Sequence, residues 1–204
     1  TRDLATRGAD LVVLPESALP FTFPRGLKRL PKLAASFGGV PVLFGAGSYA
    51  PPPDDRQYNT AYLLERDGTI AGTYDKNYPL LFGEYMPLMD KPWMQWLRKA
   101  LPYASFLTPG ESVEAFAFRG HKLGIMICYE DILPRFTRRL AGQHPNLLVN
   151  LTNDAWFGTS AEAYQHMALS VVRAVENRLY MVRSVRTGIS GFIDAAGKIY
   201  AKTE

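Results

Sequence analysis

The stretch His121-Lys-Leu-Gly-Ile-Met-Ile-Cys-Tyr-Glu-Asp131 constrains the fold more than any other, because an apolar run stops abruptly at acidic residues. Residues 123–127 are short and apolar with two isoleucines, which predicts a strand buried on both faces. The acidic residues and Pro134 indicate an exit into a turn or helix. Cys128 would then stand at the rim of a sheet, either as a small buried hydrophobic residue or as a reactive thiol.

Other predicted strands also end in polar residues. Residues 11–14 form a strand that ends at Pro15-Glu16, and residues 147–151 form one that ends in Thr152-Asn-Asp-Ala-Trp-Phe-Gly158. Two hairpins are predicted, at 59–65 with 69–74 and at 113–118 with 122–128, and Lys76 follows the first. Because α/β sheets build their sites at strand ends, we expect Glu16, Lys76 and Cys128 to face one region.

The remaining pattern predicts one α/β domain taken from a longer protein. Residues 1–7 are typical of a helix end with Gly8 as its C-cap, and 31–37 of a short helix. The other expected elements are a strand at 40–48, a helix with Ala163, Met167, Val171, Ala174 and Val175 on its apolar face, and strands at 179–185, 188–194 and 199–202. A parallel-sheet domain seldom starts with a helix, so we expect residues 1–204 to be a fragment without its first strand and C-terminal elements.

Composition narrows the functional classes. One cysteine excludes an internal disulfide, and His121, His144 and His166 have no cysteine or carboxylate at metal-ligand spacing, so neither metal nor cofactor is predicted. The net charge of +4 is scattered, without a nucleic-acid motif, and suits an anionic surface such as phospholipid only weakly. No apolar run reaches the ~18 residues of a membrane span.

Residues 78–106 form an apolar but irregular arm. Four prolines interrupt it, and aromatic and methionine side chains, Trp93 and Trp96 among them, crowd it. Such a segment either packs into the core or meets lipid, and the second is our prediction: a lid at the membrane surface.

Glu16, Lys76 and Cys128 together supply the chemistry of acyl transfer. A carboxylate can take the thiol proton, and an ammonium can stabilise first the thiolate and then a tetrahedral oxyanion. The backbone N–H of Tyr129 is a candidate second oxyanion donor.

The motifs around these residues resemble a known superfamily. Leu14-Pro-Glu16, Tyr74-Asp-Lys76 and Ile127-Cys-Tyr-Glu130 are similar to the Glu-Lys-Cys signature of the nitrilase superfamily of carbon-nitrogen hydrolases. Phe82-Gly-Glu-Tyr-Met-Pro87 and Asn153-Asp-Ala-Trp-Phe-Gly158 with Gln165-His166 resemble the apolipoprotein N-acyltransferase family within it. The chain departs from that family's usual pattern at residues 78–81 and at Arg186.

The resemblance implies an αββα sandwich in which Glu16 is the base, Lys76 the oxyanion stabiliser and Cys128 the nucleophile. It also implies that Glu84, Tyr129 and Glu130 support the site, and that Trp156 and Phe157 line the substrate pocket.

The implied activity is transfer of a fatty acyl chain. Cys128 would take it from a membrane phospholipid as a thioester and pass it to the α-amine of the diacylglyceryl cysteine of an apolipoprotein. The family implies a bacterial inner-membrane protein, held by flanking segments not in this chain, with this domain on the periplasmic side. Two alternatives stay open: a soluble amidase or ureidopropionase-like hydrolase with the same triad, and a catalytically inactive module that binds a partner.

Overall fold

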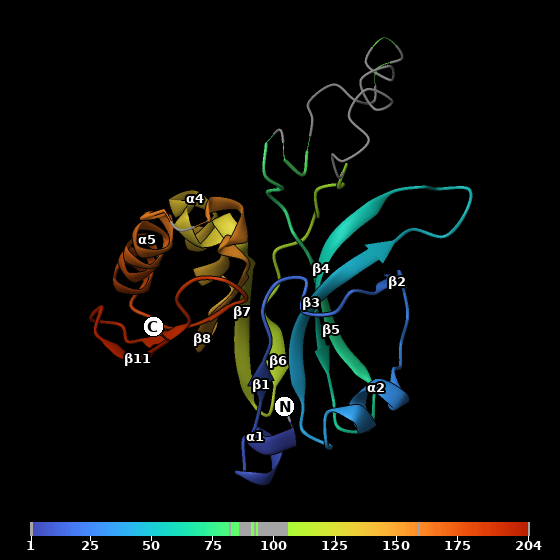
Figure 1. Ribbon diagram of the computed structural model, residues 1–204, viewed down its shortest axis with the longest axis horizontal. Coiled ribbons are helices and arrows are strands. Elements are labelled where there is room, and N and C mark those ends of the chain that lie inside the picture. Colours follow the sequence, from blue (N-terminus) through green and yellow to red (C-terminus); the bar gives the residue numbers. More distant parts are fainter. Residues whose placement is uncertain are drawn as a thin grey trace.

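The computed structural model describes residues 2–81, 83–85, 91, 93, 106–158 and 160–203 of the chain. Two β-sheets face each other, and helices lie on the outer side of each (Figure 1). The predicted αββα sandwich is therefore confirmed. In the described part of the chain, no helix combines the length and hydropathy that a membrane crossing requires.

The first sheet is built on a three-stranded antiparallel meander. Its strands are β3 (Val42–Tyr49), β4 (Gln57–Leu64) and β5 (Ile70–Asp75), and β1 (Val12–Val13) and β2 (Thr22–Pro24) both pair in parallel with β3. Alternate residues belong to different core clusters: Leu43 and Leu63 face the second sheet, whereas Phe44 and Tyr62 face the outer side. Successive side chains of a strand point to opposite faces of the sheet, and here both faces are covered, so these strands are apolar on both faces.

The second sheet has the strand order β11-β10-β9-β8-β7-β6. Its strands are β6 (Phe116–Phe118), β7 (His121–Ile127), β8 (Leu147–Thr152), β9 (Tyr180–Val185), β10 (Gly191–Ile193) and β11 (Ile199–Lys202). The central strands β7, β8 and β9 run parallel, so their carboxyl ends lie at one edge. Both predicted hairpins are confirmed, and Arg119 and Gly120 turn the second with φ of 47° and 81°.

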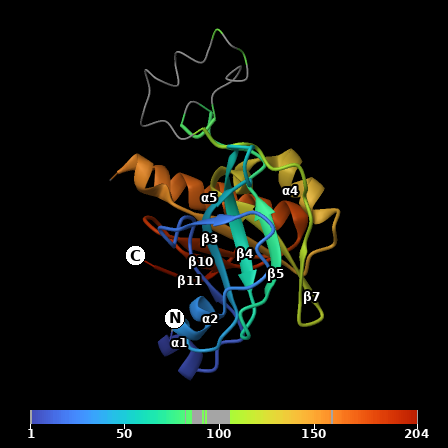
Figure 2. The same ribbon diagram turned by 90° about the vertical axis from the view of Figure 1, so that its right-hand side faces the viewer.

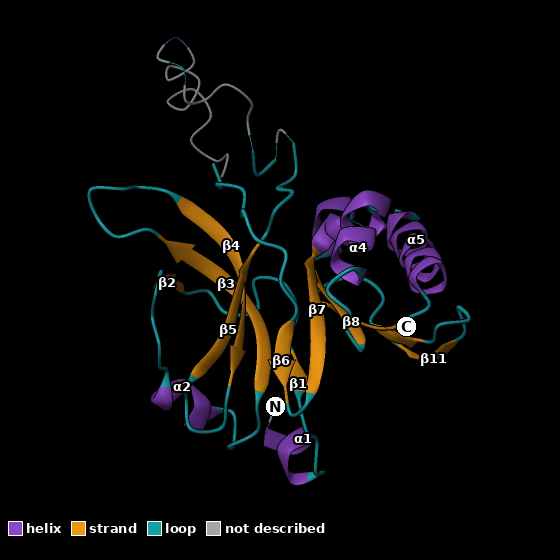
Figure 3. Cartoon of the chain, turned by 180° about the vertical axis from the view of Figure 1, so that it is seen from behind, coloured by secondary structure: helices purple, strands orange, loops and turns teal. Residues whose placement is uncertain are grey.

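Two layers of helices close the sandwich, as Figures 2 and 3 show from other sides. Helices α1 (Arg2–Thr6) and α2 (Pro31–Ser36) belong to the first sheet's side, where Ala34 is in the same core cluster as Val42 and Phe44. Helices α4 (Pro134–Ala141) and α5 (Glu162–Asn177) cover the second sheet. Short 3₁₀ turns, η2 (Cys128–Ile132) and η3 (Asp154–Phe157), follow β7 and β8.

The expected apolar face of α5 is partly wrong. Val175 is 44% exposed, whereas Arg173 is buried together with His166 and Ser170. Periodicity alone could not predict this, because His166 and Ser170 are buried against Asp131 of η2, and Arg173 donates to the Ile132 carbonyl while it pairs with Glu176 on α5.

Most of the predicted arm lies outside the described residues. Those of it that the structure describes include Tyr78, Leu81 and Tyr85, which are exposed, and Trp93, which is 63% exposed. Trp96 is among the residues not described, and the lid stays a prediction.

Candidate active site

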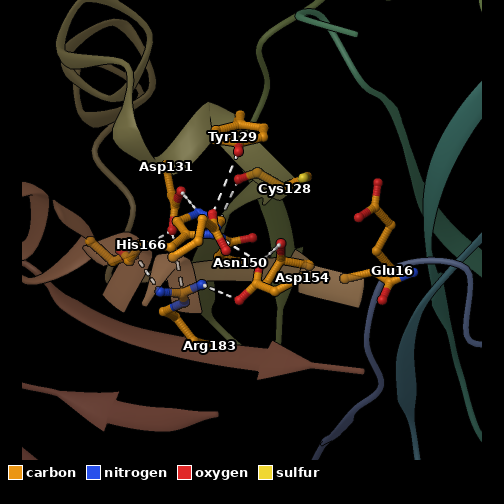
Figure 4. Close-up of polar contacts among 12 residues, drawn as sticks. Glu16, Cys128, Tyr129, Asp131, Asn150, Asp154, His166 and Arg183 are labelled. Atoms are coloured by element: carbon orange, nitrogen blue, oxygen red, sulfur yellow. Dashed lines mark hydrogen bonds and ion pairs between the residues drawn. The ribbon is translucent and has the colours of Figure 1, made fainter. Parts of the chain in front are cut away.

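Three strand ends bring Glu16, Lys76 and Cys128 to one place between the sheets. Glu16 follows β1, Lys76 follows β5, and Cys128 follows β7. All three are buried, with 5%, 1% and 6% of their surface exposed. The Lys76 Nζ lies 3.4 Å from the Glu16 Oε1. The Cys128 sulfur points toward the side from which Glu16 extends (Figure 4), and the charges of both Glu16 and Lys76 act on this thiol.

The backbone at these positions is specialised. Cys128 has a φ of 54°, and Ser17, which follows Glu16, has a φ of 49°. Residues other than glycine rarely adopt this left-handed region. Such strain persists only where surrounding contacts fix it, and it concentrates at functional sites. Gly110 lets its chain segment approach the backbone at the end of β5. Its N–H donates to the Lys76 carbonyl at 2.8 Å, and a Cβ on this residue would lie 2.1 Å from the Asp75 carbonyl oxygen.

Lys76 sits between two carboxylates. Its Nζ donates to the Glu84 Oε2 at 2.6 Å as well as to Glu16. The Asn59 side-chain amide donates to Glu16 at 2.6 Å and to Glu84 at 3.3 Å, so one amide connects both acids. Sequence reasoning missed Asn59. The available signal was the β4–β5 register, since the Lys76 N–H donates to the Asn59 carbonyl.

Glu130 ties the strand end of Cys128 to that of Lys76. Its Oε1 accepts from the Tyr74 hydroxyl at 2.7 Å and from the Asn77 N–H at 2.6 Å, and its Oε2 accepts from the Ile127 N–H at 2.8 Å. Burial raises the pKa of Glu130 to about 7, against the opposing effect of these donors. This carboxylate therefore fixes the spacing between two of the candidate catalytic groups.

The site favours a neutral thiol beside a charged lysine. Burial raises the pKa of Cys128 well above its ordinary value, and Glu16 adds to the rise while Lys76 opposes it. Burial likewise raises the pKa of Glu16, against Lys76. For Lys76, burial acts to lower the pKa, but the negative charges around it, Glu16 first, raise it overall. A base next to the thiol is then needed to generate the nucleophile.

The other predicted residues surround this centre in different ways. Tyr129 is half-buried, and its ring stacks on His166 with a centroid distance of 5.4 Å. The side chains of Trp156 and Phe157 lie outside what the structure describes, so their predicted role stays untested. Arg186, one of the departures from the family pattern, donates to the Ser17 carbonyl at 3.2 Å and so contacts the turn that follows Glu16.

A second cluster of charged side chains lies behind Cys128; Asp154 and His166 belong to stretches that resemble the family, but their contact was not predicted. His166 contacts Asp131 through Nε2 at 2.7 Å and Asp154 through Nδ1 at 2.9 Å (Figure 4). Arg183 donates to the Ser170 hydroxyl at 2.9 Å. The signal was present but weak: His166 and Ser170 are four residues apart on one face of α5.

The fold defines the class first: two facing sheets, covered by helices on both outer sides, make this a nitrilase-fold α/β protein. The family model described as carbon-nitrogen hydrolase matches residues 2–204. The chain therefore belongs to the carbon-nitrogen hydrolase family.

Curated relatives narrow the similarity. The chain is 37% identical over 199 residues to the apolipoprotein N-acyltransferase of Geobacter metallireducens, covering 96% of this chain and 38% of that protein. It is 34% identical over 192 residues to that of Aquifex aeolicus, covering 93% and 42%. The chain thus spans well under half the length of these relatives.

Solved structures share the fold at low sequence identity. A carbon-nitrogen hydrolase from Helicobacter pylori matches with a TM-score of 0.68 and 19% identity, covering 98% of this chain and 75% of that one. An amidase from Nesterenkonia sp. matches with a TM-score of 0.68 and 19% identity, covering 99% and 76%.

Proposed function

We propose that this chain is the catalytic domain of an N-acyltransferase that moves a fatty acyl group from a membrane phospholipid to the N-terminal amine of an apolipoprotein. Cys128 is the nucleophile, Glu16 the general base and Lys76 the oxyanion stabiliser. Glu84, Tyr129 and Glu130 support these groups, and Trp156 and Phe157 line the substrate pocket. The observation that carries the proposal is the buried convergence of the Glu16, Lys76 and Cys128 strand ends in a chain related to proteins named apolipoprotein N-acyltransferase.

The first half-reaction forms a thioester. Glu16 takes the Cys128 proton as the sulfur attacks the ester carbonyl, and the Lys76 ammonium stabilises the oxyanion that results. When the C–O bond breaks, protonated Glu16 returns the proton to the departing alkoxide, which leaves as lysophospholipid. This step needs a carboxylate and an ammonium at one site, and Glu16 and Lys76 lie together, with 3.4 Å between Nζ and Oε1.

In the second half-reaction the α-amine of the diacylglyceryl cysteine attacks the thioester. Glu16 accepts a proton from the amine, Lys76 again stabilises the oxyanion, and Cys128 leaves and regains its proton as the amide forms. The elevated pKa of the thiol means that the resting enzyme holds a neutral sulfur. Because the thiol is neutral, a base is essential in the first half-reaction. In the second, the return of a proton to the Cys128 sulfur as it leaves favours amide formation.

The substrates and the cellular location belong to the same proposal. A phospholipid donor and a lipoprotein acceptor both reside in a membrane, so the domain would work at the periplasmic face of the bacterial inner membrane. The names of the relatives support an apolipoprotein acceptor, and exposed Trp93 suits a membrane surface, because aromatic side chains are common at lipid headgroup boundaries.

The test uses the full-length protein that contains this chain. Incubated with phospholipid alone, it should carry a fatty acyl group on the Cys128 peptide, detected by mass spectrometry. Adding a diacylglyceryl-cysteine peptide should discharge the acyl group to the peptide amine. Release of free fatty acid only, together with cleavage of small amides, would replace the proposal with the hydrolase alternative.

A further inference from the structure

The buried cluster behind Cys128 joins two turns that follow neighbouring parallel strands. Asp131 belongs to η2, three residues after Cys128, and Asp154 begins η3, the turn that also contains Trp156. His166 of α5 contacts one carboxylate with each ring nitrogen, at 2.7 and 2.9 Å. Only the imidazolium has two N–H donors, so the protonated ring alone can bond both acids at once.

The surroundings of His166 favour the charged ring. Asp131, Asp154 and Arg183 are buried with it, and half-buried Glu162 lies 3.7 Å away on α5. Arg183 lies 3.8 Å from each aspartate, so two cations face two fully buried anions. Although burial acts to lower it, the hydrogen bonds to Asp131 and Asp154 raise the pKa of His166 to about 9. The aromatic ring of Tyr129 covers the imidazole from η2.

A metal ion is a poorer explanation of the same cluster. The expectation that His166 has no carboxylate at metal-ligand spacing is wrong, because Glu162 lies one helical turn away on α5, and Asp154, Glu162 and His166 place ligand atoms within 4.8 Å of one another. However, a metal needs a neutral imidazole nitrogen, and both nitrogens already contact carboxylates. The Arg183 guanidinium beside Asp154 would also repel a cation. The cluster is balanced by its own charges, as buried ionic groups have to be.

We propose that His166 is a positioning residue: its imidazolium locks η2 to η3 and thereby holds the Cys128 sulfur in its reactive place. The strained φ of Cys128, 54°, requires that the following residues be held firmly, and Asp131 is one of the anchors. A displacement of about 1 Å at a reacting atom can reduce a rate about 100-fold. The role presumes Cys128 as nucleophile and so rests on the proposed function.

The experiment compares the full-length wild type with His166→Gln, whose amide cannot reach both aspartates with donors. His121→Gln, at an exposed histidine that begins β7, is the matched control. At pH 7, kcat for acyl transfer should fall about 10- to 100-fold in His166→Gln, and KM should change less than kcat, because His166 itself is not among the residues proposed to line the substrate pocket. His121→Gln should match the wild type.

The pH profile separates positioning from general destabilisation. The ratio of wild-type to His166→Gln rates at each pH cancels every titration that the two proteins share. It should be large at pH 7 and approach 1 as the pH rises through about 9, where the wild-type ring loses its second donor. A ratio independent of pH, or an unchanged kcat, would overturn the proposal.

Two further measurements keep the test decisive. Alkylation of the Cys128 peptide by iodoacetamide, followed over the same pH range, should show the same convergence of the two proteins even if the wild type transfers no acyl group. If His166→Gln does not fold, Asp131→Asn/His166→Gln removes the unpaired buried anion and should restore the melting temperature. The double variant should still react at a rate whose ratio to wild type converges near pH 9, and a pH-independent ratio there would also reject the role.

Discussion

At the scale of single residues, the site is a group of buried ionisable side chains, and each of them influences the protonation of its neighbours. Lys76 is charged because two carboxylates contact it, and Cys128 is neutral because it is buried near one of them. Asn59 donates to both carboxylates and so reduces the repulsion between them.

The first prediction concerns the thiol. Cys128→Ala should abolish thioester formation, and Cys128→Ser should leave very little, because a hydroxyl is a much weaker acid and Glu16 is a poor base for it. Intact-mass measurement after incubation with phospholipid tests both variants. An acyl group that remains on Cys128→Ala would mean that another residue is the nucleophile.

The second prediction separates the base from the oxyanion stabiliser. Glu16→Gln and Lys76→Met should each lower turnover, and loss of the ammonium should cost about 10²- to 10³-fold, the usual effect of removing one preorganised donor. Single-turnover acylation and the transfer step are measured separately. Gln57→Ala, an exposed position on β4, is the control; near-normal turnover in either site variant would remove that residue from the triad.

At the scale of elements, catalytic geometry depends on how closely backbones approach. The segment through Gly110 runs against the end of β5, where its N–H bonds the carbonyl of Lys76. The parallel strands β7 and β8 place η2 and η3 at the same edge, which is why His166 can contact both turns from α5.

The third prediction tests this approach. Gly110→Ala would place a Cβ 2.1 Å from the Asp75 carbonyl oxygen, so the backbone must shift and Lys76 with it. We expect a loss of about 1–3 kcal/mol in unfolding free energy, typical of overpacking, with a lower acylation rate. Denaturant unfolding measures the first. The control is Gly142→Ala, where φ is −63° and an added Cβ would lie 3.2 Å from its nearest neighbour, the Arg139 carbonyl oxygen. This variant should lose much less unfolding free energy than Gly110→Ala, and equal losses would contradict the argument.

At the scale of the whole molecule, the two sheets meet in a core that leaves buried ionic groups at one edge. The stability of the domain should therefore depend on pH through those groups, and its use of phospholipid should depend on the surface around the arm.

The fourth prediction is a decline of stability at alkaline pH. The folded pKa of His166, about 9, exceeds the ordinary value of 6.5. Its contribution is complete below pH 6.5, decreases as the pH rises, and is lost above about 9. The shift corresponds to about 3 kcal/mol. Urea unfolding at pH 6, 8 and 9.5 should show the difference between wild type and His166→Gln shrinking; a constant difference would contradict the assignment.

The fifth prediction concerns Trp93. Because this side chain is 63% exposed, Trp93→Glu should leave the melting temperature nearly unchanged while it weakens turnover of phospholipid in vesicles. Tyr164→Glu on α5, at a residue 68% exposed, controls for adding a charge at an exposed aromatic. If both variants use phospholipid equally well, Trp93 does not meet the membrane.

The local sequence determined the elements of this fold. Alternating apolar residues, Gly-containing turns and apolar runs that stop at polar residues predicted both hairpins and the buried strand before Cys128, but not the short strand β2 or the helix α4. These patterns are readable because backbone periodicity and turn chemistry act over a few neighbouring residues. The same strand ends pointed to Glu16, Lys76 and Cys128, although only the resemblance to a family selected them among many acids and lysines.

Tertiary structure alone decided which polar side chains are buried and with whom. Asn59 serves two acids that are 43 and 25 residues away in the chain, and His166 meets Asp131 across 35 residues. No periodic pattern encodes such pairs. A buried polar group is stable only when a partner from another element compensates its lost hydration, and that partner's position depends on how the sheets and helices pack.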